Sequence, residues 1–295
     1  MVRTSFTDQV ELLRGAHSHR IPLDELRDKL SAILRPVATA AIPRSEHQIW
    51  FRAVRCETEE AFSTLRRCIY PPAERADYGR CNLKHQPAFY AGWNIPTSLV
   101  ELSAQEGELF QVIAVRPRPG IELRCAVVGA FEHYHFSGRA GLGDPWFDKT
   151  VHDQLALLSP EAQALSIYVD SFLSEEFRRP GKHPLNYKLT ATYATHFAPQ
   201  GGGVIYPSVE TRSGYNLSVA VPVFDSFFEV VEVYVLRVRA SLGFGVLDLE
   251  ELRRSSKFSK DGTIEWGAST IEKREFHPSF GLRVIAPGAW RVPDA

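Results

Sequence analysis

The chain has 295 residues, of which 44% are apolar and 23% charged, and its formal net charge at pH 7 is −1. These proportions are typical of a globular protein and exclude a disordered or collagen-like chain. A chain of this length buries roughly 75% of its unfolded surface, so its core needs neither disulfides nor a structural metal. The near-neutral charge argues against general binding to nucleic acid, because coating a polyphosphate requires an excess of basic residues.

The sequence gives no sign of export or of a membrane span. Residues 1–11 contain one basic residue and no apolar stretch, unlike a secretory signal. No run approaches the 18 apolar residues of a spanning helix. The four cysteines lack a Cys-x-x-Cys spacing, which favours reduced thiols over a disulfide framework or a zinc ribbon. We therefore expect a cytoplasmic protein.

Residues 1–46 are predicted to form a helical extension, whose clearest helix runs from Leu23 to Leu34 before Pro36. Strand-forming residues then begin near residue 49, and residues 59–67 predict a short helix capped by Thr58. The pattern next predicts a strand at 87–91, a helix at 97–106 and strands at 109–115 and 121–128.

Residues 130–198 are predicted to be mainly helical, with Ser159 as the cap of one helix. Strand patterns return at 204–208, 215–221 and 227–239, and shorter strand-like pieces follow. Strands followed by inserted helices and further strands predict an α+β domain with a split β-sheet. We divide the chain into a helical extension (1–46), a catalytic domain (47–240) and a C-terminal extension packed on the core (241–295).

Several familiar motifs are absent or incomplete. Gly138, Gly141 and Gly143 do not match the dinucleotide fingerprint and predict a loop, and there is no Gly-x-Ser-x-Gly elbow. The His-x-His pairs at 17–19 and 133–135 lack a third ligand at a recognised spacing. The sequence therefore predicts no metal site.

The segment from Arg80 to Glu101 is the richest in candidate functional residues. Arg80 and Asn82 lie in a predicted loop, Tyr90 on the next strand and Glu101 in the next helix. A carboxylate among apolar neighbours either pairs with a base or awaits a cationic ligand. Two interpretations stay open, a catalytic site or an Arg80–Glu101 ion pair that holds loop to helix. Ser208, taken alone, is typical of a turn serine that bonds its own backbone.

These segments, in this order, resemble the RES domain, a family named for its arginine, glutamate and serine. The resemblance covers roughly residues 48–240 and is carried by Phe51-Arg52-Ala53, Gly79-Arg80-x-Asn82, Pro87-Ala88-x-Tyr90, Thr97-Ser98-Leu99-x-Glu101, Gly203 to Val209 and Tyr215-Asn216-Leu217. It implies a fold similar to ADP-ribosyltransferases and NAD as the substrate. RES proteins are typically toxins that destroy NAD by hydrolysis or phosphorolysis, so the resemblance also implies a neutralising antitoxin protein. The oligomeric state stays open, a homo-oligomer included.

The resemblance implies a catalytic role for Glu101, Arg80 and Tyr90, and NAD contacts for Arg52, Arg80, Asn82, Tyr90 and Ser208. This chemistry suits the residue types. Cleavage of the nicotinamide–ribose bond builds positive charge on the ribose, which a fixed carboxylate stabilises. The planar fork of arginine suits pyrophosphate, and a tyrosine ring can stack on nicotinamide or simply fill the core.

Two further interpretations remain. The same site could transfer ADP-ribose to a protein or nucleic acid, since loops around a site select the acceptor. The chain departs from the family pattern at Cys81 and in the turn that contains Trp93. Those departures motivate the third interpretation, a non-catalytic module that binds NAD or a partner.

Overall fold

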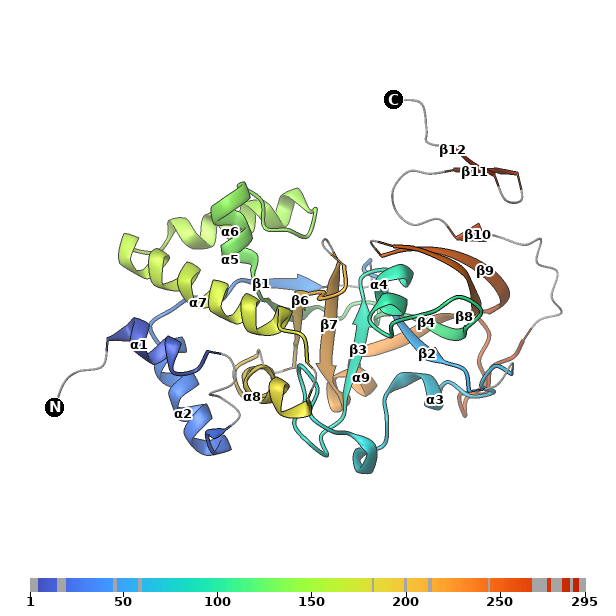
Figure 1. Cartoon of the computed structure of the whole chain (residues 1–295), viewed down its shortest axis with the longest axis horizontal. Helices are drawn as coiled ribbons and strands as arrows, with labels where there is room; N and C mark the ends of the chain where they lie inside the picture. The colour runs from blue at the N-terminus through green and yellow to red at the C-terminus, as the bar shows by residue number, and fades with distance from the viewer. Residues whose placement is uncertain are drawn as a thin grey trace.

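The chain folds as an α+β protein built on one large sheet (Figure 1). The computed structural model describes residues 5–14, 20–44, 47–57, 60–181, 183–198, 201–211, 214–243 and 245–266, and three short strands beyond residue 274. The ten strands of the sheet lie in the order β1-β5-β6-β7-β3-β2-β4-β8-β9-β10. The sheet thus draws strands from all three segments into which the sequence was divided.

Strands and helices are interspersed along the chain. The strands of the sheet are β1 (Ala41–Arg44), β2 (Trp50–Arg55), β3 (Ala88–Gly92), β4 (Leu109–Pro117), β5 (Leu123–Val127), β6 (Gly203–Pro207), β7 (Tyr215–Ala220), β8 (Phe228–Gly243), β9 (Val246–Ser255) and β10 (Glu275–Phe276). A separate pair is formed by β11 (Arg283–Ala286) and β12 (Ala289–Arg291). The helices are α1 (Phe6–Glu11), α2 (Leu23–Leu34), α3 (Arg66–Ile69), η2 (Ala73–Arg75), α4 (Ile95–Val100), α5 (Ala130–Ser137), α6 (Pro145–Ala156), α7 (Pro160–Arg178), η3 (Pro184–Tyr187), α8 (Lys188–His196) and α9 (Val221–Phe227).

Among the described strand pairs, β5–β6 is the parallel one, and the others are antiparallel. Parallel neighbours need a long crossover connection, and here the helices from α5 to α8 provide it. The predicted helical middle is therefore confirmed. Ser159 caps α7 as expected, because its side chain accepts a hydrogen bond from the backbone N–H of Ala162.

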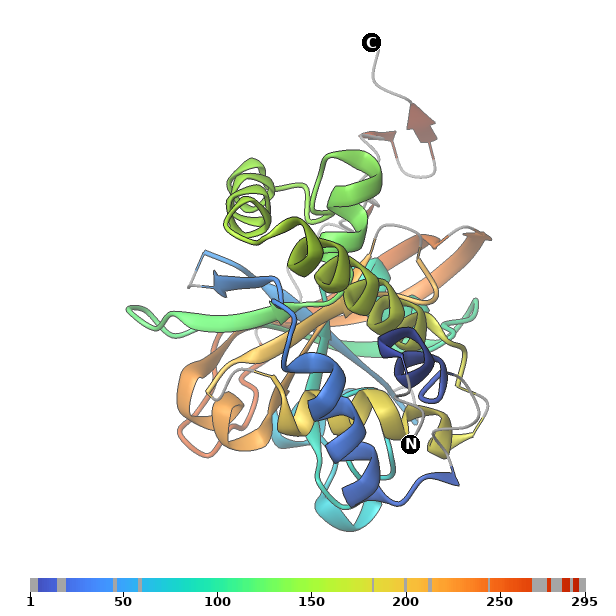
Figure 2. The same cartoon turned by 90° about the vertical axis from the view of Figure 1, so that its left-hand side faces the viewer.

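Helices pack against both faces of the sheet (Figure 2). On one face, Phe131 of α5 and Phe147 of α6 share a core with Ile205 of β6. On the other face, Leu30 of α2 and Leu189 of α8 share a core with neighbouring residues of β6. Alternate side chains of a strand point to opposite faces, which explains why β6 is buried along its whole length. The same alternation places Tyr90 of β3 on the face of the second core, whereas Arg52 of β2 lies on the face of the first core, over the Phe89 ring.

Two local predictions were wrong. The helix expected at 59–67 begins only at Arg66, because Phe62 bonds the Gln111 side chain and Thr64 pairs with a distant strand-like segment. Thr58 lies outside the described residues, as does the 17–19 histidine pair. The helix expected at 97–106 ends at Val100, and Ser103 has a left-handed backbone with φ of 51°. The interval between the strands expected at 215–221 and 227–239 forms α9, which includes the end residues 221 and 227.

The four cysteines are free and buried, as the prediction of reduced thiols requires. In the described part of the chain, no helix is both long and apolar enough to cross a membrane.

Candidate functional site

A cavity of about 250 Å³ brings together four of the six residues selected from the sequence. Arg52, Arg80, Tyr90 and Glu101 line it, and they come from β2, the loop before β3, β3 itself and the end of α4. Ser208 follows β6 and touches this group through Glu101. The members span more than 150 positions of sequence, so only the sheet order places them together.

The Glu101 carboxylate is held in place by two hydrogen bonds. The Ser208 hydroxyl donates to its Oε1 at 2.6 Å, and the Asn216 amide donates to the same oxygen at 2.8 Å. Hydrogen bonds to an ionised acceptor are stronger than neutral ones. Because Ser208 and Asn216 are both buried, the carboxylate has one defined position. The ion pair with Arg80, the alternative suggested by the sequence, does not form between these two described residues.

Close packing of α4 on β3 sets the position of Glu101. The Asn94 side chain caps α4 by accepting from the backbone N–H of Thr97 at 2.8 Å, and Pro96 suits the first turn. A Cβ on Gly92 would lie 2.8 Å from the backbone nitrogen of Ser98. Glycine at this position therefore lets the helix approach the strand. Glu101 follows the last residue of the helix and reaches across to β7.

Ser208 forms the turn expected from the sequence and also contacts Glu101. Its hydroxyl oxygen accepts from the backbone N–H groups of Glu210 (3.2 Å) and Thr211 (3.1 Å), as in a turn stabilised by serine. The same hydroxyl donates its proton to Glu101. With its acceptor side occupied by the turn, the hydroxyl can only point its hydrogen at the carboxylate.

Arg52 lies beneath the cavity and is anchored to main chain. Its Nε donates to the carbonyl oxygen of Cys68 at 3.0 Å, and its Nη1 donates to that of Tyr90 at 3.1 Å. Burial lowers the pKa of the guanidinium to about 10, so Arg52 stays charged at neutral pH. The guanidinium also lies 5.9 Å from the centre of the Phe89 ring, so it points to the opposite face of the sheet from Tyr90.

The loop before β3 is organised around the Tyr90 hydroxyl. This hydroxyl donates to the Asn82 side chain at 2.7 Å and accepts from the backbone N–H of Cys81 at 2.8 Å. Burial raises the pKa of Tyr90 well above its usual 10 and that of Cys81 to about 12. Neither group therefore exchanges a proton near neutral pH, and Tyr90 offers the cavity its ring.

The loop turns back tightly, which brings Arg80 to the cavity. Gly79 and Asn82 pair through their backbones, and a Cβ on Gly79 would lie 2.3 Å from the Asn82 side-chain oxygen. Asn82 is absent from the described residues that line the cavity, and its amide donates instead to the carbonyls of Asp77 and Leu83. The structure therefore gives Asn82 the position of a loop support.

The lining residues outside the sequence-based selection include Asn216, Tyr187 and Tyr206. Asn216 and Ser218 are buried polar residues in the strand β7, and that contrast with the apolar neighbours was a usable signal. Tyr187 belongs to η3 in the inserted helical middle, where its sequence neighbours give no indication of a site. Tyr206 alternates with buried apolar residues along β6 and is indistinguishable from a core tyrosine.

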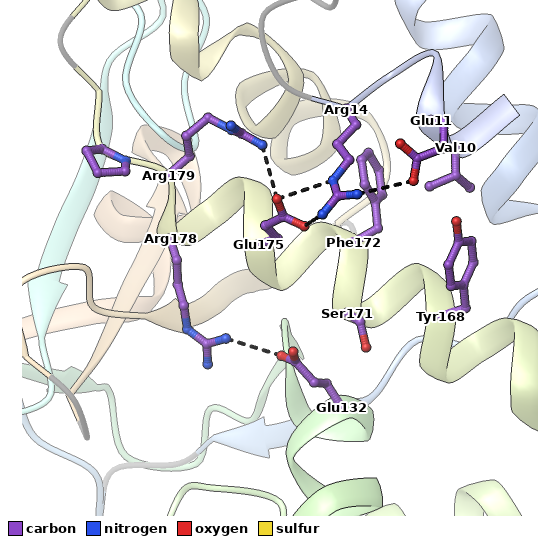
Figure 3. Close-up of a pocket in the computed structure, with 11 residues that line it drawn as sticks. Val10, Glu11, Arg14, Glu132, Tyr168, Ser171, Phe172, Glu175, Arg178 and Arg179 are labelled. Carbon is purple, nitrogen blue, oxygen red and sulfur yellow. Dashed lines mark hydrogen bonds and ion pairs between the residues drawn. The ribbon is translucent and has the colours of Figure 1, made fainter. Parts of the chain in front are cut away.

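A larger cavity of about 610 Å³ lies elsewhere, between α1, α5 and α7 (Figure 3). Its arginines are already paired with carboxylates: Arg14 with Glu175 at 2.6 Å, and Arg178 with Glu132 at 3.2 Å. None of the residues selected from the sequence lines it. Its charges are balanced internally, which leaves no unneutralised cation to attract an anionic ligand.

The described residues contain no group of three His, Cys, Asp or Glu side chains that could hold a metal ion. His133 and His135 lie on the helix α5, not on a strand, and His133 bonds the backbone carbonyl of Arg139.

The chain matches none of the family models, curated proteins or solved structures with which it was compared.

Proposed function

We propose that this protein is an NAD-consuming enzyme that cleaves the nicotinamide–ribose bond, with an ADP-ribosyltransferase-like core. One observation carries the proposal: a carboxylate, Glu101, is fixed by two hydrogen bonds in a cavity that is also lined by Arg80 and Tyr90. Charge of both signs in one cavity suits a substrate that is anionic at its phosphates and cationic at its reacting end. Its volume is slightly below the roughly 300–1,000 Å³ of common ligand pockets, which fits one nucleoside half of NAD.

In this proposal, Glu101 stabilises the developing charge on the ribose. The C1′–N bond breaks with both electrons leaving to nicotinamide, which departs neutral, while C1′ becomes oxocarbenium-like. Water or phosphate then adds to C1′; in hydrolysis, water loses one proton to solvent. A preorganised carboxylate costs no reorganisation during the reaction. The two hydrogen bonds on Oε1 hold Glu101 in that prepared position.

Nicotinamide release from NAD by the purified full chain tests the proposal. We expect turnover by the natural protein, and we expect Glu101→Gln to lower kcat roughly 10²–10³-fold, as for the loss of one transition-state stabiliser. Glutamine keeps the shape and an acceptor oxygen for Ser208 and Asn216, so the fold should persist. Glu106→Gln, an exposed residue nearby, is the matched control and should keep full activity.

The products decide between the chemical classes. Free ADP-ribose indicates hydrolysis, and phosphorylated ADP-ribose formed only with added phosphate indicates phosphorolysis. Labelled NAD that marks a macromolecule indicates ADP-ribosyl transfer. No nicotinamide release under any of these conditions would refute the proposed enzyme.

We further propose that the enzyme acts as an intracellular toxin that a partner protein neutralises, since unchecked NAD cleavage would harm its own cell. Expression of the chain alone in bacteria should then lower cellular NAD and arrest growth. The Glu101→Gln chain should do neither. Normal growth with intact NAD, at verified expression of the natural chain, would contradict the toxin role.

A further inference from the structure

Arg80 is held by a part of the chain that lies outside all the RES-like motifs. Its Nη1 donates to the backbone carbonyls of Phe177 at 2.7 Å and Arg179 at 3.0 Å. These carbonyls belong to the C-terminal end of α7, where the last carbonyls of a helix have no partner within the helix. The negative end of the helix dipole also favours a cation there. Arg80 therefore caps α7, and α7 in turn fixes one edge of the guanidinium.

Tyr187 supports the guanidinium through its aromatic ring. The Arg80 Cζ lies 4.8 Å from the centre of the Tyr187 ring, and both residues line the 250 Å³ cavity. The ring is itself packed against the backbone of Gly181. A Cβ on Gly181 would lie 2.0 Å from the Tyr187 hydroxyl oxygen and 2.1 Å from Cζ of the ring. Only glycine leaves room for the ring in this position.

Arg80 differs from the other arginines at the end of α7 in its charge balance. Arg178 pairs with Glu132, and Arg179 pairs with Glu176 at 2.7 Å (Figure 3 shows Arg178 and Arg179). Among the described residues, Arg80 has no carboxylate within ion-pair distance. Its Nε and Nη2 donate no hydrogen bond to any of these residues. Arg80 thus presents an unneutralised charge and further donors in the cavity, in a fixed orientation.

We infer that Tyr187, with the last turn of α7, forms a clamp that orients Arg80 for the phosphates of the substrate. Tyr187 is a positioning residue, and the inserted helical middle thereby completes the site formed by the sheet. The inference rests on the proposed function, because it names the part of the chain that binds the phosphates of NAD. Arginine binds phosphate through its planar fork, so its orientation controls affinity.

The experiment compares Tyr187→Phe, Tyr187→Ala and Gly181→Ala in the full chain, with NAD as the probe. Loss of the ring should raise KM for NAD roughly threefold to thirtyfold, the range of a cation–π contact, while kcat stays nearly unchanged because ground and transition states both lose the phosphate contact. Tyr187→Phe keeps the ring and should retain the natural KM. Gly181→Ala should resemble Tyr187→Ala, because its methyl group displaces the ring.

Tyr168→Ala is the control, since it removes a tyrosine ring from α7 at the larger cavity and should leave KM unchanged. Circular dichroism and thermal unfolding verify that each variant is folded. An unchanged KM in folded Tyr187→Ala, or an equal loss in Tyr187→Phe, would overturn the clamp while natural turnover still supports the enzyme. If the natural chain releases no nicotinamide, calorimetric binding of NAD to the natural chain and to Tyr187→Ala tests the clamp. Weaker binding to Tyr187→Ala than to the natural chain supports the clamp alone, and no binding or equal binding overturns it.

Discussion

The buried carboxyl of Asp170 should make the stability of the protein fall as pH rises from 4 to 7. Asp170 lies on α7 and is 6% exposed. Its two oxygens accept from the backbone N–H groups of Gly129 (2.9 Å) and Glu132 (3.0 Å) at the start of α5. Burial raises the pKa of this carboxyl from 3.8 to about 7, against the opposing effect of these hydrogen bonds.

The sign follows from proton binding. Between pH 4 and 7, Asp170 is mostly protonated in the folded chain and mostly ionised in the unfolded chain. The folded state therefore binds more protons, and the free energy of unfolding decreases as pH rises. Since the pKa of Asp170 moves from 3.8 in the unfolded chain to about 7 in the folded chain, this carboxyl contributes roughly 4 kcal/mol to the pH dependence of the free energy of unfolding. This contribution is fully present below pH 4 and is lost as pH passes through 7.

Urea unfolding of the natural chain and of Asp170→Asn from pH 4 to 8 measures this contribution. Asparagine cannot ionise and leaves one N–H without its acceptor, so the natural chain should be more stable at pH 4 by about 1–3 kcal/mol. That advantage should shrink and reverse by pH 8. The control is Asp24→Asn, at an exposed residue with 86% of its side chain accessible. Its free energy of unfolding should differ from that of the natural chain by less than about 0.5 kcal/mol at every pH. An advantage of the natural chain that grows with pH would refute the reasoning.

Three further outcomes are expected. Asn216→Ala removes a hydrogen bond to the ionised Glu101, worth about 1.5–3 kcal/mol; kcat for nicotinamide release should fall roughly tenfold to hundredfold, and an unchanged kcat would exclude Asn216 from positioning the carboxylate. Gly79→Ala places a Cβ 2.7 Å from the Tyr90 hydroxyl oxygen, so thermal unfolding should show that the free energy of unfolding falls by about 1–3 kcal/mol. An unchanged stability would mean that the loop tolerates a side chain at this position. Leu30→Ala empties a fully buried position on α2 and should cost about 2–5 kcal/mol in urea unfolding; a smaller cost would mean that α2 contributes little to the core.

The long periodic segments could be predicted from the sequence, but the short ones depended on distant contacts. The helix from Leu23 to Leu34 was predictable, because one apolar stripe and Pro36 define it locally. Residues 60–64 favoured a helix by local preference, yet Phe62 and Thr64 bond partners far along the chain. A short helix has too few internal hydrogen bonds to compete with such contacts.

The candidate site also has features that depend on single residues and features that depend on distant contacts. Residue type and order along the chain were enough to select Glu101, Arg80 and Tyr90, because their chemistry is a property of the side chains themselves, and the RES resemblance added Arg52. The contact of Asn216 with Glu101 and the support of Arg80 by Tyr187 were not predictable, since both depend on which strands are neighbours and where α7 ends. The sequence by itself therefore determined the long elements and the types of reactive group. The order of the strands and the crossover of the helices, which arise from burial of apolar faces across the whole chain, decided which of those groups meet.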